Sequence, residues 1–63
     1  MPLITLATNV PEEKIPADFN EIFSTFLSEI FQKPSANFGV LVTPGSRLTI
    51  GGSSKPGAMI VAS

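Results

Sequence analysis

The chain has 63 residues, 43% of them hydrophobic and 14% charged, a net charge of −1 with four basic residues, and no cysteine, histidine, tyrosine or tryptophan. The missing residue types exclude disulfides, histidine or cysteine metal sites and most nucleophilic catalytic groups. The low positive charge excludes a basic surface for nucleic acid. No apolar run reaches about 18 residues, which excludes a membrane-spanning segment. Domains this short bury only about 60% of the surface of the unfolded chain, so we expect a partner chain or further sequence to supplement the core.

The first predicted element is a strand over residues 2–8. Its sequence, Pro-Leu-Ile-Thr-Leu-Ala-Thr, is apolar and rich in β-branched residues, and it is bounded by Asn9 and Pro11. The acidic segment 10–15 then predicts a loop that leads into a helix, with Pro16 in the opening helical turn.

An amphipathic helix is the clearest pattern in the chain. It begins near Phe19 and ends at Lys33, because Pro34 forces an extended conformation on the residue before it. Its apolar residues are spaced by alternating threes and fours, which predicts one stripe that faces a core: Phe19, Ile22, Phe23, Phe26, Leu27, Ile30 and Phe31. The carboxylates lie on the preceding loop and the polar face of this helix, which predicts a solvated surface: Glu12, Glu13, Asp18, Glu21 and Glu29.

The second half of the chain contains two further strand patterns. Residues 38–43 predict a strand that ends at the turn Pro44-Gly45, residues 47–50 a shorter extended piece, and residues 58–62 a last strand. The loop between them contains Gly-Gly-Ser-Ser-Lys at 51–55, but it lacks the spacing of a phosphate loop and a strand follows it, which favours a structural turn.

The strands at 2–8 and 38–43 are joined through one helix, which predicts a β-α-β unit with parallel strands and a right-handed crossover. Alternate residues of both strands place apolar side chains on both faces of the sheet, whereas one helix can cover only one face. We therefore expect the uncovered face to contact another chain or a second β-α-β unit.

Pro2 is the candidate catalytic residue. Cells commonly remove an initiator Met before a small residue or proline, which would leave a secondary amine at the start of the first strand. An α-amino group has a reference pKa of about 8, and burial in an apolar pocket would favour its neutral, proton-accepting form. The alternative is that Pro2 only opens a strand, a position that proline tolerates.

Lys33 is the candidate substrate-binding residue. A cation at the end of the helix could hold a substrate carboxylate. The alternative is that Lys33 only complements the negative end of the helix dipole.

Both residues belong to a longer pattern that resembles the macrophage migration inhibitory factor and D-dopachrome tautomerase family. The pattern covers the whole chain without gaps, and its opening, residues 2–11, is particularly similar to nematode members. The matching positions are Met1-Pro2, Thr8-Asn9-Val10-Pro11, Pro16, Lys33-Pro34, Pro44, Gly51-Gly52-Ser53-Ser54, Pro56 and Ala58.

The resemblance implies an α+β fold of the tautomerase type. Residues 1–63 would form its N-terminal half, one of two β-α-β units related by a pseudo-two-fold axis, with the second unit absent from this sequence. It also implies a homo-oligomer, a trimer or, as an alternative, a hexamer of single units.

The same resemblance implies a keto-enol tautomerase of the phenylpyruvate or dopachrome type, an intramolecular oxidoreductase. Pro2 would move a proton beside a carbonyl, and Lys33 would hold the carboxylate of a small keto or enol substrate, without a cofactor or a metal. Asn37 stands where some members have a pocket tyrosine, which argues against a preference for aromatic substrates.

Two other functions stay open. The protein could be a secreted, cytokine-like ligand of a cell-surface receptor that modulates an immune response, or the chain could be an inactive truncated fragment. The first residues lack a signal-peptide pattern, which predicts a cytoplasmic location, and the resemblance implies secretion without a signal peptide.

Overall fold

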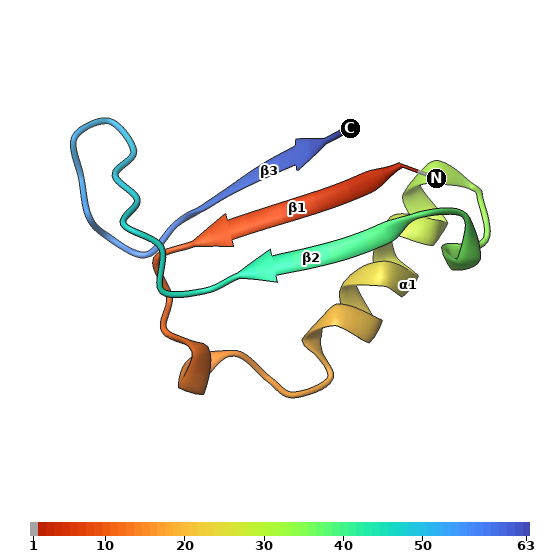
Figure 1. Ribbon diagram of the computed structural model, residues 1–63, viewed down its shortest axis with the longest axis horizontal. Coiled ribbons are helices and arrows are strands. Elements are labelled where there is room, and N and C mark those ends of the chain that lie inside the picture. The colour runs from red at the N-terminus through yellow and green to blue at the C-terminus, as the bar shows by residue number, and fades with distance from the viewer. Residues whose placement is uncertain (1) are drawn as a thin grey trace.

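The computed structural model describes residues 2–63 and consists of a three-stranded sheet with one α-helix packed on it (Figure 1). Strand β1 spans Leu3–Thr8, helix α1 spans Phe19–Phe31, β2 spans Gly39–Thr43 and β3 spans Ala58–Ala62. Two 3-10 helices lie in the connections, η1 at Glu12–Lys14 and η2 at Ser35–Asn37. The predicted strands and the predicted helix are confirmed. The segment 47–50, predicted to be extended, contributes only an isolated bridge at Ile50.

The start of the helix differs from the prediction. Pro16 lies before α1, where its carbonyl accepts a hydrogen bond of 3.1 Å from the Phe19 N–H, and Asp18 occupies the N-cap position, its backbone carbonyl accepting from the Ile22 N–H at 3.1 Å. Residues 16–19 therefore form a separate turn that changes the direction of the chain before the helix begins.

β1 is the central strand of the sheet, which has the order β2-β1-β3. It pairs in parallel with β2, from Leu3 opposite Gly39 onward, as expected for a β-α-β unit. Along its other edge it pairs antiparallel with β3, with Ile4 opposite Ala62 and Thr8 opposite Ala58. β1 and β2 therefore begin at the same end of the sheet, and β3 ends there.

The core lies between α1 and the β1–β2 pair. Its buried residues are Ile4, Leu27 and Phe38, and the half-buried Phe23 and Val40 pack against them. Alternation along β1 places Ile4 on the helix side of the sheet, as the period of two predicts.

The apolar stripe of α1 is only partly buried, which corrects the expectation that all of it faces a core. Leu27 is 7% exposed and Phe23 is half-buried, whereas Ile22, Phe26 and Ile30 are 55–57% exposed. The reason is that α1 packs mainly against β2, so one flank of the helix has no neighbour among the described residues. No helix within residues 2–63 is long and apolar enough to cross a membrane.

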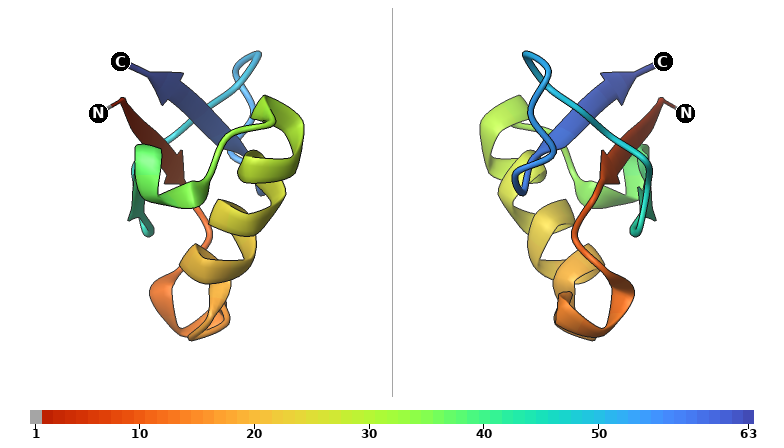
Figure 2. Two further views of the ribbon diagram at one scale, coloured as in Figure 1. Left: turned by 90° about the vertical axis from the view of Figure 1, so that its right-hand side faces the viewer. Right: turned by 90° about the vertical axis from the view of Figure 1, so that its left-hand side faces the viewer.

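The sheet face opposite α1 is open, and no helix of the described chain covers it (Figure 2). The strand register places Leu3, Leu41, Met59 and Val61 on this face, and each is between 42% and 55% exposed. The prediction of one uncovered apolar face is therefore confirmed.

The last turn of α1 offers a test of local strain. Gln32 adopts the left-handed conformation, with φ 54° and ψ 41°, where the Cβ of an ordinary residue costs about 1 kcal/mol. We expect Gln32→Gly to raise the free energy of unfolding by about 0.5–1 kcal/mol in urea titrations, because glycine has no Cβ. Gln32→Ala keeps the Cβ and is the control. Equal stability of the two variants would show that the conformation carries no strain.

Candidate functional site

A hollow of about 760 Å³ lies at the end of the sheet where β1 begins. Its size is in the range of small-molecule sites, about 300–1,000 Å³. The hollow contains both residues that the sequence singled out, Pro2 and Lys33, and its remaining lining residues are Phe31, Ala36, Asn37 and Phe38.

The β-α-β topology explains why these residues meet. Because β2 runs parallel to β1, the helix between them must return the chain to the end of the sheet where β1 starts. Residues 32–38, which link α1 to β2, therefore pass beside Pro2. The Gly39 N–H donates a 2.9 Å hydrogen bond to the Pro2 carbonyl and so fixes the start of β2 against the start of β1.

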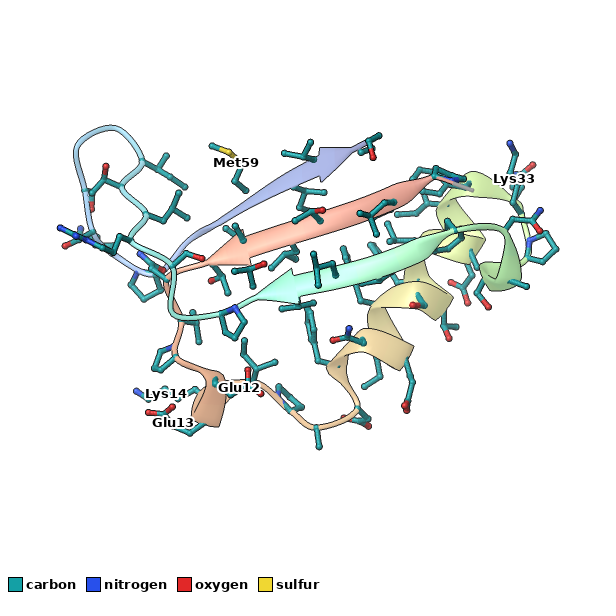
Figure 3. The ribbon with its side chains drawn as sticks, viewed as in Figure 1. Glu12, Glu13, Lys14, Lys33 and Met59 are labelled. Atoms are coloured by element: carbon teal, nitrogen blue, oxygen red, sulfur yellow. The ribbon has the colours of Figure 1, made fainter. Side chains whose placement is uncertain are left out.

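The backbone of Lys33 is held in place by Ser28. The Lys33 N–H donates to the Ser28 carbonyl at 3.2 Å, and the Ser28 hydroxyl donates to the Lys33 carbonyl at 2.6 Å. Figure 3 shows the Lys33 side chain at the opposite end of the molecule from Glu12 and Glu13. No ion pair engages Lys33 within residues 2–63, so its exposed cation is available to a bound carboxylate.

Two phenylalanines form an aromatic wall of the hollow. Phe38 is 7% exposed and belongs to the core, whereas Phe31 is 45% exposed. Their rings meet edge to face, with centroids 6.0 Å apart and an interplanar angle of 84°. This is a favourable arrangement for aromatic pairs, and it holds the outer ring against a rigid one.

Pro2 is exposed, so residues 2–63 alone do not supply the apolar burial that would favour a neutral amine. The physical reason is that Pro2 lies at the end of the sheet, where the linker 33–38, the start of β2 and the end of β3 adjoin it without enclosing it. Additional burial would have to come from another chain or from further sequence. The expected removal of Met1 concerns a residue outside those that the structure describes.

The other sequence motifs have structural roles or lie in solvent. Gly51 and Gly52 have φ values of 58° and 77° and form a two-residue turn, across which Ile50 and Ser53 exchange hydrogen bonds of 2.9 and 3.0 Å. This hairpin turn leads to β3, so the interpretation as a structural turn is confirmed. The five carboxylates are all exposed, as predicted: Glu12, Glu13, Asp18, Glu21 and Glu29.

The amide of Asn37 is a polar group in the lining of the hollow that sequence patterns do not predict. An isolated asparagine after a helix belongs to no motif that indicates a site, and only the family resemblance draws attention to position 37. Its place in the hollow follows from η2, the short helix that turns the chain from α1 into β2.

Comparison with known proteins gives consistent matches over the whole chain. The family model for macrophage migration inhibitory factor matches residues 1–63. The chain is 36% identical over 58 residues to a macrophage migration inhibitory factor homolog of Trichinella spiralis, covering 92% of this chain and 51% of that protein. It is 32% identical over 63 residues to D-dopachrome decarboxylase of Xenopus tropicalis, covering 100% of this chain and 53% of that protein.

A solved structure of macrophage migration inhibitory factor from Oncomelania hupensis is similar to this fold, with a TM-score of 0.84 at 32% identity. The match covers 95% of this chain and 44% of that one. The chain thus spans about half the length of the curated relatives it matches.

Proposed function

This chain belongs to the macrophage migration inhibitory factor family, whose members are tautomerases and cytokines, and we propose that its hollow is part of a keto-enol tautomerase site. The substrates are small keto or enol carboxylates of the phenylpyruvate or dopachrome type. One observation carries the proposal: a potential base at Pro2, a free cation at Lys33 and an aromatic wall share one hollow.

Pro2 is the base in this proposal. Once Met1 is removed, the nitrogen of Pro2 is a secondary amine with a lone pair, whereas in the intact chain it is an amide without basicity. In the keto-to-enol direction the amine takes the proton from the carbon beside the carbonyl. The C–H electron pair becomes the C=C bond, the carbonyl π pair moves to oxygen, and that oxygen takes a proton from water to complete the enol, while the protonated amine returns its proton to solvent. General-base catalysis of this kind contributes about 10²- to 10⁴-fold.

Lys33 binds the substrate carboxylate and so fixes the reacting carbon beside Pro2. A charged hydrogen bond to a carboxylate contributes about 1.5–3 kcal/mol when both partners are held. The two bonds between Ser28 and the backbone of Lys33 supply part of that rigidity.

We expect Lys33→Met to lower kcat/KM for ketonisation of enol-phenylpyruvate by about 10- to 100-fold, mostly through a higher KM. The enol is followed by its ultraviolet absorbance. Lys55→Met is the matched control, because Lys55 is exposed in the loop before β3, at the far end of the sheet from Lys33. An unchanged KM in Lys33→Met would remove Lys33 from substrate binding, and a protein with no rate above the uncatalysed reaction would remove the tautomerase proposal itself.

The proposal includes a homo-oligomer, a trimer or a hexamer of single β-α-β units. Two observations support assembly: the apolar face opposite α1 is open, and Pro2 is exposed in the single chain. Neighbouring subunits that cover this face and edge would supply the burial that favours a neutral amine. Sedimentation equilibrium should give three or six times the chain mass, and full activity in a monomer would contradict this part of the proposal.

A further inference from the structure

We propose that a smaller cavity, at the end of the sheet opposite Pro2, binds the hydrocarbon tail of a medium-chain fatty acid, whose carboxylate pairs with Lys14. The cavity has a volume of about 290 Å³, near the lower end of the range for small-molecule sites, about 300–1,000 Å³. It lies between the end of β1, the segment 10–16, the first residue of α1 and Ala58 of β3. It shares no lining residue with the hollow at Pro2, so this inference goes beyond the proposed tautomerase function.

The inner wall of the cavity is apolar. It is formed by two residues of β1, Leu6 and Thr8, which are 9% and 5% exposed. The Thr8 hydroxyl donates to the Gly57 carbonyl at 2.7 Å and accepts from the Val10 N–H at 3.2 Å. Because this hydroxyl is already bonded as donor and as acceptor, water that enters the cavity gains few hydrogen bonds, whereas a hydrocarbon group loses nothing.

The outer walls of the cavity are fixed by backbone hydrogen bonds and by aromatic stacking. The Ile15 N–H donates to the Glu12 carbonyl at 3.0 Å, and the Phe19 N–H donates to the Pro16 carbonyl at 3.1 Å. The Phe19 ring stacks on that of Phe23, with centroids 5.6 Å apart and an interplanar angle of 14°. A hydrocarbon tail can therefore add apolar burial without the cost of ordering these walls.

Lys14 supplies the charge that a carboxylate requires. It is exposed and lines the cavity, whereas the neighbouring Glu12 and Glu13 are exposed outside the lining. Its ammonium group forms none of the side-chain hydrogen bonds within residues 2–63. One cation beside an apolar cavity matches a ligand with an apolar tail and a single anionic head group, which is the chemistry of a fatty acid.

The cavity stays accessible in the proposed oligomer. Thr8 and Ala58 are opposite each other in the β1–β3 pair and lie on the side of the sheet that carries α1, whereas the proposed subunit contacts cover the other face. Figure 3 shows Lys14 at the opposite end of the molecule from Lys33. A fatty acid at Lys14 therefore competes neither with these contacts nor with a substrate in the hollow.

The test is a titration of methyl-labelled protein with octanoate, followed by NMR. The methyl signals of Val10 and Ile15 should shift until the site is saturated, whereas the methyl signal of Ala36, in the hollow at Pro2, should stay in place. Butyrate should bind at least about 10-fold more weakly, since each buried methylene contributes about fourfold in affinity. Octylammonium has the same tail as octanoate and should also bind more weakly, because Lys14 repels it.

Two substitutions on β3 localise the site. Ala58→Leu places a larger side chain in the cavity and should weaken octanoate binding by at least about 10-fold. Ala62→Leu is the matched control, because Ala62 is exposed on the same strand and the same side of the sheet but outside the cavity, and it should keep the wild-type affinity.

Lys14→Met should weaken octanoate binding by about 2- to 5-fold, as expected for the loss of an exposed ion pair, and should leave octylammonium binding unchanged or stronger. Shifts at Ala36 in place of Val10 and Ile15, wild-type affinity in Ala58→Leu, or equal affinities for octanoate and octylammonium would overturn the inference. None of these measurements depends on turnover, so failure of the tautomerase proposal leaves this site untouched.

Discussion

Replacing Pro2 by glycine is expected to lower kcat/KM for ketonisation of enol-phenylpyruvate by at least about 100-fold, the lower bound of what a positioned general base contributes. Glycine keeps a terminal amine after removal of Met1, so the variant does not simply delete the nitrogen. It loses the ring that fixes the direction of the lone pair and turns a secondary amine into a primary one. The measurement is the ultraviolet assay of enol decay, with intact mass confirming that Met1 is absent.

Two controls isolate the role of the nitrogen. Pro56→Gly makes the same substitution at an exposed proline just before β3, at the opposite end of the sheet, and should keep activity within about twofold of wild type. Protein that retains Met1 should be inactive, because its Pro2 nitrogen is an amide. Equal rates for the Met1-containing and Met1-free proteins would remove Pro2 from the mechanism.

Asn9→Ala is expected to destabilise the protein by about 2–3 kcal/mol, the largest stability effect that we predict. The Asn9 amide nitrogen lies 3.3, 3.2 and 2.9 Å from the carbonyl oxygens of Leu48, Ser54 and Lys55, which share its two N–H donors, and the Asn9 side-chain oxygen accepts from the Gly57 N–H at 2.9 Å. One side chain thus holds together the loop that leads into β3. Alanine leaves these backbone groups to water and the loop free to open.

The predicted loss can be localised by amide hydrogen exchange. In Asn9→Ala, amides that pair β1 with β3 should lose protection, whereas amides that pair β1 with β2 should keep most of theirs. Asn9→Asp keeps the acceptor for the Gly57 N–H but places a negatively charged oxygen opposite three carbonyl oxygens, so it should destabilise the protein at least as much as Asn9→Ala. Wild-type stability and unchanged hydrogen exchange of the β3 amides in Asn9→Ala would show that the loop is stable without the hydrogen bonds of Asn9.

The sequence predicted the elements of this fold well because their signals are local. The apolar residues from Phe19 to Phe31 are spaced by three and four, which is the period of a single helix, and Pro34 ends that helix irrespective of tertiary contacts. The parallel pairing of β1 and β2 also follows from the sequence, since a helix that links two neighbouring strands returns the chain to the end of the sheet where the first strand began. The same rule places Lys33, which follows the helix, in one hollow with Pro2.

The tertiary structure decided what depends on residues far apart in the chain. The antiparallel pairing of β3 with β1 joins residues such as Ile4 and Ala62, and an apolar strand does not specify which edge it will take. The helix stripe was equally uninformative about burial: Leu27 is covered and Ile30 is not, because the width of the sheet beneath α1 decides which apolar side chains find neighbours.

Composition, spacing and proline positions thus determined the helix and the strands, since each depends on backbone preferences within a few residues, whereas Pro2 and Lys33 were proposed from the chemistry of their side chains and from the family resemblance. Exposure of Pro2, the place of Asn37 in the hollow and the clamp at Asn9 were decided only by the folded chain. These features arise where separate segments approach one another, and the geometry of that approach is set by the packing of the whole sheet and helix.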